Sequence, residues 1–113
     1  MHELAITQSV VDAVTERTGS APVAAVRVRV GRLAGVVPDA MRFCFELVTA
    51  GTPVEGAVLE IEQPEGHGRC RDCGEEFLLA DLVLLCPCGS ADVEVLTGRE
   101  LAVASVVMAA PTG

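Results

Sequence analysis

The sequence predicts an α+β fold, in which a small mixed sheet is packed by two helices and carries an inserted four-cysteine, zinc-ribbon-like domain. Three observations indicate this fold. Segments with apolar residues at helical spacing are interspersed with segments in which apolar and polar residues alternate. Four cysteines lie close together between residues 70 and 88, and a further apolar segment follows them. Half of the 113 residues are hydrophobic, which excludes a disordered chain.

The first helix is predicted over residues 4–18, and the second begins at Pro38, which suits the first position of a helix. Gly19 and Gly51 follow the two helices, at positions where glycine often ends a helix. Cys44 falls on the apolar stripe of the second helix, where we expect a small, buried hydrophobic residue. The stripes consist of Leu4, Ile6, Val10, Val11, Ala13 and Val14 in the first helix, and of Met41, Cys44, Phe45 and Val48 in the second.

Two segments, 23–30 and 57–62, show the alternation of strands with one buried face. In the first, valines alternate with Arg27 and Arg29, so the valines should face a core. The second carries glutamates at its polar positions, and these would pair with the arginines if the two strands are neighbours. Residues 63–69 contain a proline and two glycines and are predicted to form a linker.

Further strands are predicted at 93–96 and 101–108, after the cysteine-rich segment. The second belongs to a nearly unbroken apolar run over residues 101–110, which we expect to be a buried strand. A membrane helix would need about 20 apolar residues, so no membrane association is expected.

The net charge and the first residues of the chain limit the classes of protein to which it can belong. A net charge of −8 and only three aromatic residues argue against a nucleic-acid partner. The first residues lack a charged leader with an apolar core, so we expect a cytoplasmic protein. In that reducing compartment, closely spaced cysteines bind metal more often than they form disulfides.

The cysteines form two short pairs, Cys70 with Cys73 and Cys86 with Cys88, separated by twelve residues. Two close thiolate pairs joined by a hairpin-sized segment are typical of a tetrahedral zinc site. The second pair, Cys-Pro-Cys, is one residue shorter than usual, and His67 could replace one sulfur. Iron is the alternative metal for such a ligand set, but thiolates in a reducing cytosol favour structural zinc.

His2 allows a second kind of metal site. The α-amine of Met1, backbone amides and the imidazole of His2 could supply several nitrogen donors to one ion. A square plane of nitrogen donors suits Ni(II) or Cu(II). Glu3 could add a carboxylate or hold the loop. The other interpretation of His2 is a solvated side chain with no ligand role.

Four stretches, spread in order over residues 1–90, carry a resemblance to a known family. They are residues 1–11 (MHELAITQSVV), 28–43 (VRVGRLAGVVPDAMRF), 51–57 (GTPVEGA) and the cysteine block that ends in CGS at 88–90. Together they resemble the HypA/HybF family of hydrogenase-maturation nickel chaperones.

The resemblance implies a nickel metallochaperone rather than an enzyme. Such a protein would bind Ni(II) at its amino terminus and deliver it to the large subunit of [NiFe]-hydrogenase during maturation. His2 matches the family's nickel ligand, with Met1 and Glu3 beside it. The four clustered cysteines match the zinc ligands, and the zinc would be structural and could also regulate the nickel site.

The resemblance also implies a domain division and partners. The nickel-binding α/β domain would comprise residues 1–66 and 92–113, and the zinc-binding domain residues 67–91. Expected partners are a nickel-delivering maturation GTPase, the hydrogenase large subunit and urease accessory proteins, and the chain would be a monomer or a homodimer. The sequence has no phosphate-binding loop of its own, in keeping with a separate GTPase.

The alternative function is a zinc-ribbon adaptor that binds only protein partners, with His2 incidental. This alternative predicts bound zinc but no stoichiometric nickel. A hydrolytic zinc enzyme is disfavoured, because four cysteines leave no open coordination position for a substrate.

Overall fold

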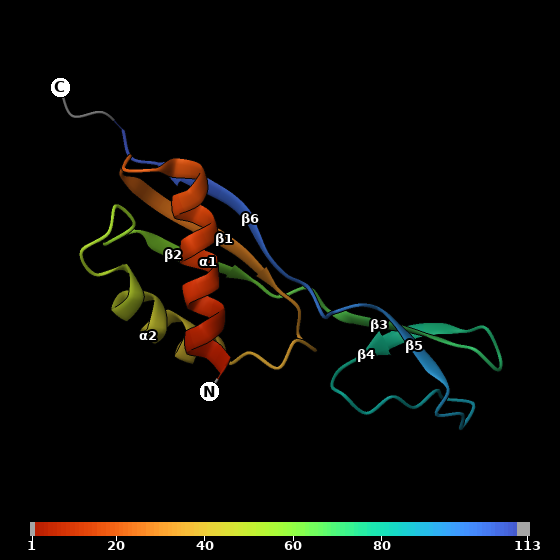
Figure 1. Cartoon of the computed structure of the whole chain (residues 1–113). Coiled ribbons are helices and arrows are strands. Elements are labelled where there is room, and N and C mark those ends of the chain that lie inside the picture. Colours follow the sequence, from red (N-terminus) through yellow and green to blue (C-terminus); the bar gives the residue numbers. More distant parts are fainter. Residues whose placement is uncertain (1, 111–113) are drawn as a thin grey trace. The chain divides into compact units, whose positions relative to one another are not determined.

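The computed structural model describes residues 2–110 (Figure 1). In chain order the elements are α1 (His2–Thr18), β1 (Val23–Val30), α2 (Pro38–Thr49), β2 (Val58–Glu62), β3 (Gly66–Cys70), β4 (Glu76–Leu79), β5 (Val93–Thr97) and β6 (Leu101–Met108). Within the described residues, neither α1 nor α2 has the length and apolar content that a membrane-spanning helix needs.

The chain divides into two compact units, each with a three-stranded sheet. Within the described residues, the helical unit comprises residues 2–28, 36–61 and 102–110. The cysteine unit comprises residues 29–35 and 62–101. The division of the chain into a nickel-binding and a zinc-binding domain, with the zinc-binding domain at residues 67–91, stays a prediction. The two structural units divide the chain at other residues.

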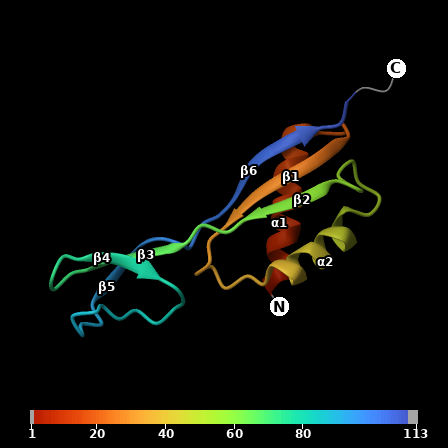
Figure 2. The same ribbon diagram turned by 180° about the vertical axis from the view of Figure 1, so that it is seen from behind.

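The helical unit contains a mixed sheet with the strand order β2-β1-β6, and both helices lie on one face of this sheet (Figure 2). β1 and β2 run parallel, and β6 runs antiparallel to β1 (Figures 1 and 2). Val26, Val28 and Val30 of β1 are completely buried, as their alternation predicts. Burying one valine side chain contributes about 1.5–3 kcal/mol, so the central strand is a main source of stability. The helices add to the buried core Val10, Val11 and Val14 from α1 and Met41 and Phe45 from α2.

The predicted pairing of charges between β1 and β2 is confirmed. Arg27 Nε lies 3.1 Å from Glu60 Oε2, and Arg29 Nη2 lies 3.6 Å from Glu62 Oε2. These side chains are exposed, so each ion pair contributes only about 0–1 kcal/mol. Their main effect is to keep one face of the sheet polar.

Some predictions about the helix stripes were wrong. Leu4 is 51% exposed and Ala13 is exposed as well, whereas Thr7 is completely buried. Thr7 can be buried because its hydroxyl donates a hydrogen bond to the carbonyl of Glu3 at 2.6 Å, which satisfies the polar group within the helix. Cys44 is half-buried rather than buried, since it lies at the margin of the stripe that Met41 and Phe45 form.

The cysteine unit has the sheet order β4-β3-β5, and the predicted linker at 63–69 was wrong. Most of that segment is β3, the central strand, which pairs antiparallel with both neighbours. Its glycines serve close packing rather than a turn. A Cβ at Gly66 would lie 2.7 Å from Leu33 Cδ1, and one at Gly68 would lie 2.8 Å from Val93 Cγ1.

The prediction of a buried last strand was also wrong. β6 forms an edge of its sheet, with most of its residues exposed. Leu101, Val107 and Met108 are 44%, 56% and 42% exposed. The apolar run indicated a strand correctly, but composition alone cannot tell a central strand from an edge strand.

Candidate metal centres

The structure brings together the four cysteines that the sequence spacing singles out. Their Sγ atoms all lie within 4.8 Å of one another. Cys70 Sγ is 3.8 Å from Cys88 Sγ, and Cys73 Sγ is 3.6 Å from Cys86 Sγ. Four sulfurs about 2.3 Å from a tetrahedral zinc ion are separated by about 3.8 Å, so this spacing fits that ion.

The two cysteine pairs form similar turns although the second is one residue shorter. The amide of Cys73 donates to Cys70 Sγ, and the amide of Cys88 donates to Cys86 Sγ, both at 3.4 Å. In each turn the following glycine amide donates to the carbonyl of the first cysteine at 2.8 Å. Pro87 removes one amide from the shorter turn, but neither of these hydrogen bonds uses that amide. The shortened pair therefore still directs both sulfurs inward.

A polar bridge that sequence reasoning missed joins the two turns. The Ser90 hydroxyl donates to the Asp72 carboxylate and accepts a hydrogen bond from the amide of Asp92. Arg71 Nη1 donates to Asp92 Oδ1 at 2.8 Å. These contacts hold the segments after β3 and before β5 together. Ordinary surface residues carry no sequence signal for such a bridge, because the partners are about twenty positions apart.

The surroundings of the cluster shift the pKa values of Cys70 and Cys86 in opposite directions. The amide of Cys73 lowers the pKa of the Cys70 thiol to about 7. The pKa of the Cys86 thiol rises to about 12, because burial and the neighbouring thiols outweigh the opposing hydrogen bond from the Cys88 amide. A divalent cation would offset the repulsion between thiolates. The donor set thus fits zinc, which prefers sulfur ligands in a closed tetrahedron.

His67 is not part of this cluster. In the described part of the chain, the group of potential metal ligands consists of the four cysteines. His67 lies on β3 instead, where its Nδ1 is 3.1 Å from Thr97 Oγ1. The arrangement gives no support to histidine as a substitute for one sulfur.

The residues predicted to hold nickel lie at the start of α1. Met1 is outside the described residues. The His2 side chain is 56% exposed, and its Nε2 lies 3.6 Å from Glu3 Oε2. The Glu3 side chain is only 13% exposed, and the same oxygen accepts a hydrogen bond from the amide of Val37 at 3.1 Å. An accessible imidazole therefore stands beside an anchored carboxylate.

Comparisons with known proteins identify the family. A family model described as hydrogenase/urease nickel incorporation, metallochaperone, hypA matches residues 1–108. The chain belongs to the HypA family. The hydrogenase maturation factor HypA of Geotalea uraniireducens is 51% identical over 104 residues, which cover 91% of this chain and 94% of that protein. The protein of the same name from Nostoc punctiforme is 45% identical over 106 residues, or 94% of each chain.

The fold agrees with this membership. The solution structure of the Ni metallochaperone HypA from Helicobacter pylori matches with a TM-score of 0.68, covering 98% of this chain and all of that one at 23% identity. The α+β fold, the four-cysteine cluster and the resemblance to the HypA family are thereby confirmed. As a HypA family member, the chain is a nickel metallochaperone of hydrogenase maturation.

The contact between Glu3 and Val37 predicts an acid-dependent loss of stability. This hydrogen bond from the Val37 amide is the main reason that the pKa of the Glu3 carboxyl lies below its usual value. A carboxyl with a lowered pKa in the folded state stabilises the fold above its unfolded pKa and loses this contribution as the pH falls through the folded pKa. The advantage of the native protein over Glu3→Gln should therefore be constant near neutrality and shrink below about pH 4.5.

Urea unfolding at a series of pH values, followed through the methyl resonances of Val26, measures this effect in the helical unit. Glu16→Gln is the matched control, because Glu16 is an exposed glutamate of the same helix. Parallel stability curves for the native protein and Glu3→Gln across the acid range would contradict the prediction.

Proposed function

We propose that the chain binds one Ni(II) ion through His2, the α-amine of Met1 and Glu3, and delivers it to the large subunit of [NiFe]-hydrogenase. The observation that carries the proposal is the exposed His2 imidazole beside the Glu3 carboxylate. Membership of the HypA family supports nickel as the cargo. The proposed role is transfer of a metal ion by ligand exchange, without covalent catalysis.

The local electrostatics explain why Glu3 matters to this site. The start of a helix carries the positive end of the helix dipole, which disfavours a cation. A carboxylate in the first turn offsets that effect, and the Val37 amide keeps this carboxylate in place. High exposure of His2 would let an acceptor protein reach the ion, so that ligands can be exchanged one at a time.

The second metal in the proposal is zinc, held by Cys70, Cys73, Cys86 and Cys88. Bound there, zinc would supply a structural cross-link between the two cysteine turns. We assign the nickel role to residues 1–66 and 92–113 and the zinc role to residues 67–91. The proposed partners are a nickel-delivering GTPase, the hydrogenase large subunit and urease accessory proteins, all in the cytoplasm.

Transfer can be tested with purified components. Tag-free protein with its native first residue is loaded with zinc and about one equivalent of nickel, then mixed with nickel-free hydrogenase large subunit and a chelator that traps released nickel. We expect nickel to move to the large subunit, whereas free Ni(II) salt at the same concentration should be trapped by the chelator. Recovery of the protein-loaded nickel only in the chelator would contradict delivery. Bound zinc without any nickel would favour the zinc-ribbon adaptor.

A further inference from the structure

The segment between β4 and β5 exposes three large apolar side chains (Figure 1). Residues 80–85, here called the apolar loop, follow β4 and lead to Cys86. Leu82, Val83 and Leu85 of this loop are 60%, 67% and 53% exposed. Single exposed apolar residues are common on protein surfaces, but a contiguous group of them marks an interaction surface.

Hydrogen bonds and one anchor fix the conformation of the apolar loop. The Val83 amide donates to Asp81 Oδ1 at 2.8 Å, and the Leu85 amide donates to the Val83 carbonyl at 3.1 Å. Leu84 is half-buried and packs against the core of the cysteine unit, which includes Cys86. The loop therefore presents its exposed side chains in a defined arrangement, which lowers the entropic cost of binding a partner.

The surroundings of the apolar loop are acidic. No lysine, arginine or histidine occurs between residues 72 and 98, whereas six acidic residues do. Three of the six pair with Arg69 or Arg71. The other three, which make no ion pair within the described part of the chain, are Asp72, Glu75 and Asp81. Four thiolates around one zinc ion add further negative charge to this end of the unit.

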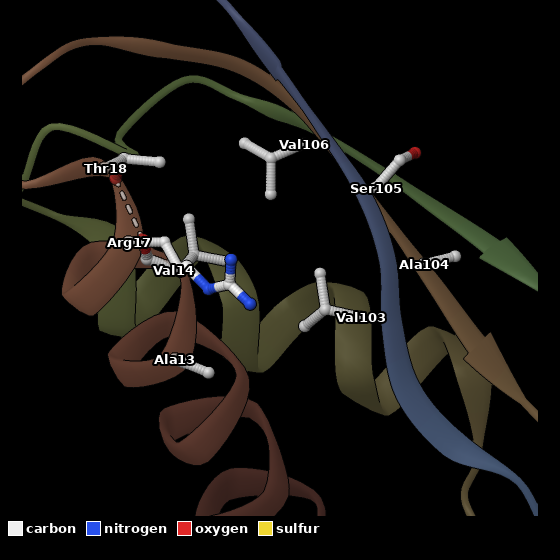
Figure 3. Close-up of a pocket in the computed structure, with 8 residues that line it drawn as sticks. All are labelled: Ala13, Val14, Arg17, Thr18, Val103, Ala104, Ser105 and Val106. Carbon is white, nitrogen blue, oxygen red and sulfur yellow. Dashed lines mark hydrogen bonds between the residues drawn. The ribbon is translucent and has the colours of Figure 1, made fainter.

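A second apolar surface lies in the helical unit and differs in charge. A groove of about 450 Å³ lies between α1 and β6 (Figure 3). Val103 and Val106 of β6 point toward the helix, and Arg17 is the one charged residue that lines the groove. A lone cation favours an acidic ligand, whereas the acidic surroundings of the apolar loop favour a basic one. The two surfaces therefore suit different partners.

We propose that the apolar loop docks into an apolar cleft, rimmed by lysine and arginine, on the nickel-free large subunit of [NiFe]-hydrogenase. Charge complementarity selects this class of partner. An anionic membrane or a nucleic acid would be repelled by the acidic surroundings, and a second copy of the chain would bring the same acidic groups face to face.

The choice of the large subunit rests on the proposed function. An acceptor must stay bound while nickel leaves His2, so it needs a contact that includes no nickel ligand. The apolar loop supplies such a contact, because it belongs to the cysteine unit whereas His2 belongs to the helical unit. Docking therefore leaves the exposed imidazole of His2 free for ligand exchange.

Isothermal titration calorimetry of the zinc-loaded full chain with the purified large subunit, without nickel in either protein, tests the docking. Val83→Ser should weaken binding by at least about tenfold, because burial of this exposed valine is lost from the complex. Val107→Ser, at a 56% exposed valine of β6, is the matched control and should bind as the native chain does. The zinc content and amide dispersion of each variant verify that it is folded.

A second pair of variants tests the charge. Asp81→Asn removes a charge from the apolar loop but keeps the oxygen that accepts the Val83 amide. It should weaken binding by about fivefold at low ionic strength, and high salt should weaken the native complex by screening. Asp12→Asn is the matched control, since Asp12 is an exposed aspartate of α1 whose Oδ1 also accepts a hydrogen bond, from Gln8 Nε2 at 2.9 Å. This control should bind normally.

Four results would overturn the proposal. They are a native chain that does not bind the large subunit, equal affinities of Val83→Ser and the native chain, loss of binding in Val107→Ser alone, and an affinity that rises with added salt. Docking of the loop on the maturation GTPase instead would show that the chosen partner is wrong. Because no nickel is present, failure of the docking and failure of nickel delivery are separate results.

Discussion

Replacing His2 with alanine is expected to abolish stoichiometric nickel binding by the zinc-loaded protein. The imidazole is the one side chain in the first turn of α1 that carries a nitrogen atom, and it stands beside the Glu3 carboxylate. Loss of residues that merely support metal ligands typically costs about 10–100-fold in affinity, so loss of the ligand itself should cost at least about 100-fold. Equilibrium dialysis and the weak visible band of square-planar Ni(II) measure the effect. The protein must be tag-free, because added residues would displace the α-amine of Met1.

His67→Ala is the matched control for this experiment. His67 is the only other histidine of the chain, and it is hydrogen-bonded to Thr97 within the sheet of the cysteine unit. This variant should bind nickel as the native protein does. Equal nickel binding by the His2 and His67 variants would move the site elsewhere, and no binding by any of the three proteins would favour the adaptor.

Removal of metal from the four-cysteine site is expected to unfold the cysteine unit. The buried core of this unit is small and includes two of the cysteines themselves, with Leu33, Leu79 and Val93. Structural zinc contributes about 10–16 kcal/mol of binding free energy in small zinc domains, and that energy is available only to the folded state. Amide resonances of β3, β4 and β5 should lose their dispersion after chelation, while those of β1 and the helices keep theirs.

Single substitutions refine this test. Cys86→Ser should lower zinc affinity by at least about 100-fold and produce the same loss of dispersion, because one of four ligands is removed. Cys44→Ser is the matched control, since Cys44 belongs to α2 and lies outside the cluster. An ordered cysteine unit in the fully chelated protein would show that the cluster packs without metal, and the structural role of zinc would be wrong.

The sequence by itself predicted several features that depend on local pattern. The alternating valines predicted the buried face of β1, and Pro38 predicted the start of α2. The spacing of the cysteines predicted which four sulfur atoms lie close together. Each of these depends on residues that are close in the chain, or on ligand types with a preferred coordination geometry.

The tertiary structure decided what depends on distant neighbours. Only the folded chain shows that Glu3 is anchored by the amide of Val37, a residue 34 positions away, or that Ser90 bridges to Asp72. Gly66 indicated a linker, yet β3 is a central strand, because a glycine that permits close packing and one that permits a turn look alike in sequence. The apolar run of β6 likewise indicated burial, whereas strand order left it at an edge. Periodicity encodes which residues share a face, but burial of that face depends on which elements the rest of the chain places against it.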